Sequence, residues 1–132
     1  MTNPILAALL VACGCATAYA ADTDALWAAV CQVETGGDAS AYNESEQAAG
    51  IAQIRPICLR DCNRIAGYER WTLADRYDVA ESRAMFELYT AHYTRRIGWT
   101  AERAARCWNG GPTGWKKEST LGYWRKVQEL MP

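Results

Sequence analysis

Four carboxylates lie close together in the N-terminal part of the sequence, where Glu34 is followed within twelve residues by Asp38, Glu44 and Glu46. Glu34 ends an apolar segment with helical spacing, and two glycines follow at positions 36 and 37. The partial negative charge at a helix C-terminus disfavours an ionised carboxyl. General acid catalysis requires a carboxyl with a raised pKa. Glu34 is therefore the candidate acid, although solvated surface charge is the ordinary role of such residues.

Four short motifs contain or follow this glutamate, in the order Val33-Glu34-Thr35-Gly36-Gly37, Gly50-Ile51-Ala52-Gln53-Ile54-Arg55-Pro56, Trp108-Asn109-Gly110-Gly111 and Glu118-Ser119-Thr120-Leu121-Gly122-Tyr123. They resemble the E-S, G-L-M-Q-I-x-P, A-Y-N-A-G and E-T-x-x-Y motifs of the soluble lytic transglycosylase family, part of the lysozyme-like superfamily. The resemblance spans Val33 to Val127. It implies a mainly α, lysozyme-like fold, in which a helical bundle and a small irregular or β lobe flank a substrate cleft.

The resemblance also implies roles for individual residues. Glu34 matches the family's catalytic acid/base, and Gln53 matches the glutamine that lines the cleft. Asn109 matches the asparagine of the third motif, and Tyr123 matches the tyrosine beside the catalytic glutamate. Asn43 falls near the serine that supports that glutamate. Gln53 and Asn109 could instead satisfy buried backbone groups.

Aromatic side chains near the third motif are candidates for sugar binding, because an aromatic face packs well against the apolar face of a pyranose. Trp108 and Trp115 lie beside the Asn-Gly-Gly-Pro sequence. We expect them at the cleft and most other tryptophans in the core.

The resemblance implies peptidoglycan as the substrate and a lytic transglycosylase that cleaves the MurNAc-GlcNAc bond with Glu34 alone, releasing 1,6-anhydromuramyl products. Two alternatives stay open. A lysozyme would hydrolyse the bond and recruit Asp38, Glu44 or Glu46 as a second carboxylate. A catalytically silent wall-binding protein could use the same scaffold.

Helices must supply most of the framework, since no long alternating strand pattern is present. Capping by Asp22, Thr23 or Asp24 predicts a helix from Ala25 to about Glu34. Further helices are predicted over Pro56–Ala66, Val79–Ile97, Thr100–Trp108 and Thr120–Leu130, the second of them after a capping-box pattern at Asp78 and Glu81. The polar stretch from Asp38 to Ala49 is predicted to be a loop or a short hairpin.

The length of 132 residues fits one compact domain. Its 14 basic and 15 acidic residues give no reason to expect nucleic acid as a partner. The charge is unevenly distributed, with six acids and no Lys or Arg from Asp22 to Ile54. We expect a monomer that needs no cofactor, no metal and no stable membrane span.

The first twenty residues are uncharged and contain a short apolar run, which predicts a signal peptide at 1–20 and an exported domain at 21–132. A lipoprotein anchored at Cys13 is the alternative. Cleavage after Ala20 leaves four cysteines, an even number that favours two disulfides over zinc: Cys31, Cys58, Cys62 and Cys107. We expect Cys58 and Cys62 each to pair with Cys31 or Cys107.

Overall fold

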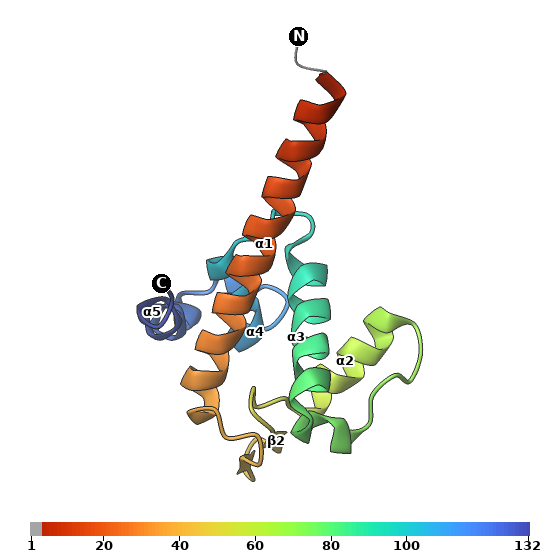
Figure 1. Ribbon diagram of the computed structural model, residues 1–132. Coiled ribbons are helices and arrows are strands. Elements are labelled where there is room, and N and C mark those ends of the chain that lie inside the picture. Colours follow the sequence, from red (N-terminus) through yellow and green to blue (C-terminus); the bar gives the residue numbers. More distant parts are fainter. Residues whose placement is uncertain (1–3) are drawn as a thin grey trace.

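The computed structural model describes the backbone of residues 4–132 and the side chains of residues 18–132. Its longest helix is α1 (Pro4–Thr35), which begins well before the predicted Ala25 (Figure 1). Thr23 does not cap a helix, because its hydroxyl donates to the Tyr19 carbonyl one turn earlier, at 2.9 Å. The predicted signal peptide at 1–20 overlaps the start of this helix and stays a prediction, and the side chain of Cys13 lies outside the described residues.

The other helices follow the predicted order, and α2 (Pro56–Ala66) has the predicted bounds. Helix α3 (Val79–Thr94) stops three residues before the predicted Ile97, α4 is Ala101–Gly110 and α5 is Leu121–Glu129. Short 3-10 helices, η1 (Leu73–Tyr77), η2 (Gly114–Lys116) and η3 (Glu118–Thr120), join them. Asp78 caps α3 by accepting from the Glu81 amide at 2.9 Å, but the Glu81 carboxylate binds the Trp71 indole instead of completing the capping box.

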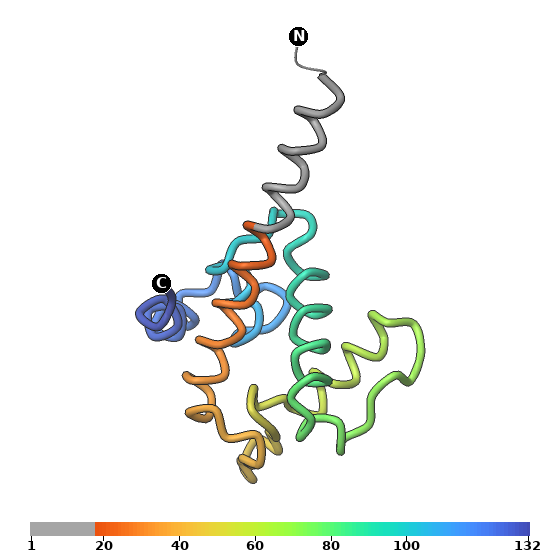
Figure 2. Tube along the Cα trace, viewed as in Figure 1, coloured from red at the N-terminus to blue at the C-terminus, as the bar shows by residue number. Residues whose placement is uncertain are grey.

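Helix α4 is the centre of the bundle, because it contacts α1, α3 and α5, while α2 packs on α3. Figures 1 and 2 show α5 and α2 on opposite sides of the molecule and the β structure at one end. The core between the helices is aromatic: Phe86 lies 5.4 Å from Trp27 and 5.1 Å from Trp108, measured between ring centroids. Within the described part of the chain, no helix is long and apolar enough to cross a membrane.

A small antiparallel hairpin forms the second lobe, as the polar stretch predicted. Strand β1 (Tyr42–Asn43) pairs with β2 (Ala48–Ala49). The buried Arg76 guanidinium holds this lobe to η1, since its Nη1 donates to the carbonyls of Gln47 at 2.7 Å and Ile54 at 2.9 Å. Gly50 fits against the same residue with φ +81°, and a Cβ there would lie 1.7 Å from the Arg76 carbonyl oxygen. The two lobes are thus joined by specific backbone contacts.

Candidate active site

A cleft of about 860 Å³ lies between the helices and the hairpin lobe. Its walls come from the end of α1, the hairpin, α2, α3 and the end of α4. Five of the seven residues that the sequence predicts at the site line it: Glu34, Asn43, Gln53, Trp108 and Asn109. The structure therefore brings together side chains that are up to 75 residues apart in sequence.

Glu34 lies in the last turn of α1, which ends at Thr35. The backbone then turns away through Gly36 and Gly37, both with positive φ, and the Gly37 amide donates back to the Cys31 carbonyl at 3.2 Å. Burial raises the pKa of the Glu34 carboxyl to about 7, and the charge of Glu46 adds to this effect. A carboxyl with this pKa is substantially protonated near neutral pH, as a general acid must be.

Tyr123, also predicted at the site, does not line the cleft. Its hydroxyl is buried and makes no well-aligned hydrogen bond with any described residue. The two side chains nevertheless interact: burial and the Glu34 charge raise the pKa of Tyr123 well above its usual range, and the Tyr123 hydroxyl lowers the pKa of Glu34. The hydroxyl is therefore placed to donate to Glu34 once that carboxyl loses its proton.

The hairpin supplies a second carboxylate. Glu46 lines the cleft and forms an ion pair with Arg55 at 2.6 Å. Asn43 orders the turn that carries it, since its Oδ1 accepts from the Ser45 hydroxyl at 2.8 Å and from the Glu46 amide at 3.3 Å. These contacts hold an ionic pair at the rim of the cleft.

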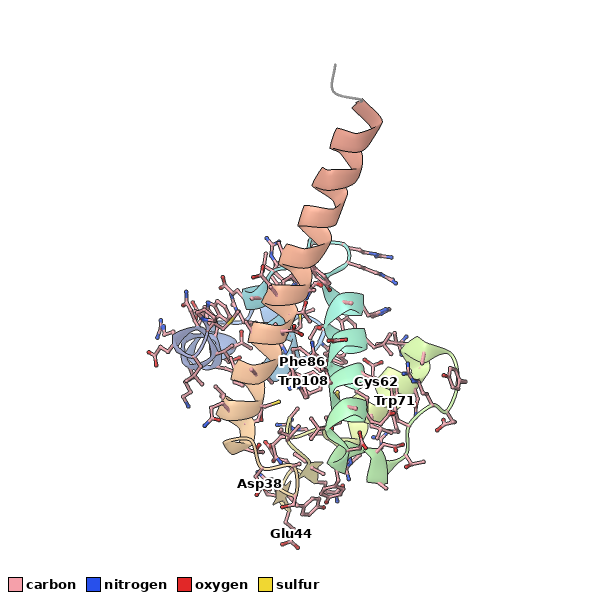
Figure 3. All side chains as sticks on the ribbon, viewed as in Figure 1. Asp38, Glu44, Cys62, Trp71, Phe86 and Trp108 are labelled. Atoms are coloured by element: carbon pink, nitrogen blue, oxygen red, sulfur yellow. The ribbon has the colours of Figure 1, made fainter. Side chains whose placement is uncertain are left out.

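The other two loop carboxylates do not reach the cleft. Asp38 is exposed and accepts from the hydroxyl and amide of Ser40, contacts that lower its pKa. Figure 3 shows Asp38 and Glu44 at the tip of the hairpin lobe, well away from Trp108. Of the three candidates for a second carboxylate, only Glu46 lines the cleft.

Gln53 connects the hairpin to the floor of the cleft. It has positive φ, 54°, and its side-chain amide donates to the carbonyls of Gly50 at 3.1 Å and Ala41 at 3.4 Å. The Thr35 hydroxyl donates to the Ile51 carbonyl at 2.8 Å and so joins the end of α1 to the same loop. The motif around Gln53 therefore builds the loop as well as lining the cleft.

Helix α4 brings Asn109 and Trp108 to the opposite wall. Trp108 packs edge-on against Phe86 and Tyr89, with centroids 5.1 and 5.6 Å away, so it belongs to the core and to the cleft surface at once. Trp115, the other tryptophan expected here, does not line the cleft.

No sequence motif indicated the far wall of the cleft, which α2 and α3 form. There the Asp61 carboxylate accepts from the Tyr93 hydroxyl and, at 2.8 Å, from Arg64 Nε. Arg60 lines the same wall. These residues belong to no motif and resemble the solvated face of an amphipathic helix. Only their position in the fold shows that they border the cleft.

The four cysteines of the predicted mature chain are free thiols in the structure, so the two expected disulfides are not formed. Cys58 lies one turn from Cys62 along α2, and the interaction of the two thiols together with burial raises the pKa of Cys58 well above the usual range. Burial raises the pKa of Cys31 to about 12. Among the described residues, no group of three or more His, Cys, Asp or Glu side chains could hold a metal ion.

A partly buried glutamate with a raised pKa, in a cleft between a helical bundle and a small β lobe, defines a lysozyme-like glycosidase. Known proteins bear this out. The chain is 32% identical to a lysozyme of Ostrea edulis over 129 residues, which cover 94% of this chain and 90% of the relative. It is 33% identical over 103 residues to lysozyme 1 of Crassostrea virginica, covering 75% of this chain, and spans only about half (54%) of that relative's length.

The chain belongs to the family of bivalve lysozymes, the i-type lysozymes. Its fold is similar to a chain in the crystal structure of Aeromonas hydrophila PliI in complex with Meretrix lusoria lysozyme, with a TM-score of 0.68, 26% identity, and coverage of 80% of this chain and 87% of that one. No protein-family profile matches the sequence. The lysozyme-like superfamily is thus confirmed, but the relatives do not support its assignment to the soluble lytic transglycosylases.

Proposed function

We propose that this chain is a lysozyme that hydrolyses the glycosidic bond between MurNAc and GlcNAc in peptidoglycan. The observation that carries the proposal is the burial of Glu34 in a cleft, with its pKa raised to about 7, while Glu46 lines the same cleft as a second carboxylate. Kinship with bivalve lysozymes supports the same activity.

Glu34 is the proposed general acid. Its protonated carboxyl gives a proton to the leaving glycosidic oxygen as positive charge develops on the sugar ring. The Glu34 carboxylate that remains accepts a hydrogen bond from the buried Tyr123 hydroxyl, which otherwise has no aligned partner among the described residues. Tyr123 is thus a positioning residue that stabilises the product form of the acid.

Glu46 is the proposed second carboxylate, because hydrolysis needs a group that activates water or stabilises the positive sugar. Arg55 forms an ion pair with its carboxylate at 2.6 Å and so holds the side chain at the rim of the cleft. One carboxyl is therefore partly buried and has a raised pKa, while the other is exposed and paired with a cation. This division of roles matches what a two-carboxylate glycosidase requires.

Substrate binding is assigned to Gln53, Asn43, Asn109 and Trp108, which surround Glu34 in the cleft. The three amides offer donors and acceptors to sugar hydroxyls and acetamido groups. Trp108 offers an aromatic edge. The proposal includes export of the chain and action as a monomer on peptidoglycan strands, without a cofactor.

Analysis of the products tests the proposal. Purified peptidoglycan is digested in water enriched in ¹⁸O, and the released muropeptides are analysed by mass spectrometry. Hydrolysis places ¹⁸O at a reducing MurNAc end that borohydride reduces. A lytic transglycosylase would instead release 1,6-anhydromuramyl ends without the label, and a wall-binding protein would release nothing. Either of these results would refute the assignment as a hydrolase.

A further inference from the structure

Three arginines lie along the exposed side of α2 where it borders the cleft, and two of them are neutralised. Arg55, which precedes the helix, pairs with Glu46 at 2.6 Å, and Arg64 pairs with Asp61 at 2.7 Å. Arg60 lies between them and forms no ion pair or side-chain hydrogen bond within the described part of the chain. It is an exposed guanidinium at the cleft whose five N–H groups remain available.

A second hollow begins where the cleft ends. It lies at the C-terminal end of α2 and shares Arg60 and Arg64 with the cleft. Tyr68 contributes an aromatic ring to it and is 63% exposed. The acidic residue that lines this hollow, Glu69, accepts a hydrogen bond from the side-chain amide of Asn63 at 3.3 Å. The two hollows form one continuous surface with the available arginine at their junction.

The spacing along α2 fits a substituent of the glycan. At about 1.5 Å per residue, Arg60 lies roughly 7 Å beyond Arg55 along the helix axis, and Arg64 about 13 Å beyond it. An extended peptide advances about 3.3 to 3.6 Å per residue. A peptide attached to a sugar near Glu34 and Glu46 would therefore bring its second to fourth residues alongside Arg60 and Arg64.

We propose that Arg60, at the junction of the two hollows, binds the free carboxylates of the stem peptide carried by the muramyl sugar of peptidoglycan. The proposal rests on the proposed function and names the part of the substrate that this wall recognises. Guanidinium and carboxylate groups form paired, charge-assisted hydrogen bonds. The neighbouring cation Arg64 is already engaged by Asp61. Arg60 is thus a specificity residue that favours peptide-bearing strands over bare glycan.

Two substrates test this, which differ in the stem peptide and in the lactyl carboxylate that removal of the stem exposes. Peptidoglycan strands are compared with the same strands after an amidase has removed their stems. The variants are Arg60→Gln and Arg60→Lys. Arg125→Gln is the control, because Arg125 is exposed on α5, on the opposite side of the molecule from α2, and it too has no ion pair among the described residues (Figure 1).

We expect Arg60→Gln to raise KM about threefold on stem-bearing strands, the size appropriate to one exposed ion pair, and to leave kcat unchanged. Its KM on stem-free strands should equal that of the wild type. Arg60→Lys should show a smaller rise in KM on stem-bearing strands than Arg60→Gln. Arg125→Gln should leave KM unchanged on both substrates.

The inference would be overturned if Arg60→Gln raised KM equally on both substrates, or if Arg125→Gln raised KM as much as Arg60→Gln does. It would also be overturned if the wild type had the same KM for stem-bearing and stem-free strands. Cleavage of the stem-free strands by the wild type tests the proposed function separately. If neither substrate is cleaved, the proposed function fails. Binding of the free tetrapeptide stem, followed by NMR chemical shifts, then decides the inference: its Kd must rise about threefold in Arg60→Gln.

Discussion

The two sides of the cleft place the same residue type in opposite environments. Glu34 ends a long helix packed into the core, and its burial raises its pKa to about 7. Glu46 belongs to a hairpin with two-residue strands, and its side chain is 47% exposed and paired with Arg55. The difference indicates that the surrounding wall sets the properties of each carboxyl, because the glutamate side chain itself is the same in both.

The walls also differ in how they are held. The helical wall is fixed by side-chain packing, such as the contact between Phe86 and Trp108. The hairpin wall depends on backbone contacts of Gly50 and on the hydrogen bonds of Arg76. A substitution that disturbs side-chain packing should therefore alter the surroundings of Glu34. A substitution at a single backbone contact of the hairpin should instead move Glu46.

Replacing the acid should have the largest effect. We expect Glu34→Gln to lower kcat at least about 1000-fold, because the amide cannot give a proton to the leaving oxygen. Release of soluble fragments from peptidoglycan measures this, with circular dichroism as the check on folding. A folded variant that keeps more than about a tenth of wild-type activity would contradict the proposed role of Glu34 as proton donor.

Glu46→Gln tests the exposed wall. We expect a loss of about 100-fold in kcat if Glu46 acts as the second carboxylate. Glu44→Gln is the matched control, since Glu44 lies on the same hairpin turn but outside the cleft, and it should retain wild-type activity. The comparison between the walls breaks down if the two variants behave alike, and a loss below about tenfold for Glu46→Gln would indicate that Glu34 acts alone.

Two glycine substitutions separate the hairpin contact from ordinary backbone strain. Gly50 and Gly37 both have positive φ, but a Cβ at Gly50 would clash with the Arg76 carbonyl while a Cβ at Gly37 would meet nothing within 4 Å. We expect Gly37→Ala to cost about 1 kcal/mol of unfolding free energy and Gly50→Ala at least about 3. Urea unfolding measures both. Equal losses would show that the Gly50 contact does not hold the hairpin.

The pH dependence of activity offers the finest test. Glu34 must be protonated to act, so kcat/KM should fall as pH rises above about 7. The Tyr123 hydroxyl and Arg55 lower the pKa of Glu34, so Tyr123→Phe and Arg55→Gln should move this fall to higher pH. Glu46 raises that pKa, so Glu46→Gln should move it to lower pH. If all three variants moved the fall in kcat/KM in the same direction, the interactions assigned to Glu34 would be contradicted.

Local sequence signals predicted much of the framework. Pro56 and Gly67 bound α2 at the predicted residues, and Thr100 caps α4 by accepting from the Arg103 amide at 3.1 Å. Asp22, Thr23 and Asp24 suggested a helix start that the structure does not have. A polar residue inside a helix can bond to the preceding turn, so its presence alone does not set a boundary.

The motifs predicted the acid but not the whole site. Glu34, Gln53 and Asn109 stood out because they lie in short motifs that resemble those of the soluble lytic transglycosylases, a family of the lysozyme-like superfamily. They therefore indicated the fold correctly while suggesting the wrong family within it. Arg60 and Asp61 could not be recognised, since a helix face that borders a cleft has the same polar pattern as one that faces water.

The protonation state of Glu34 is the most direct test of the difference between the walls. Titration of the Glu34 δ-carbon by ¹³C NMR in the wild-type protein should give a midpoint at about 7, with Glu34→Gln used to assign the signal. A midpoint near the ordinary glutamate value of about 4.3 would mean that the carboxyl is ionised at neutral pH. In that case the helical wall would not raise the pKa of Glu34, and Glu34 could not serve as the proton donor at neutral pH.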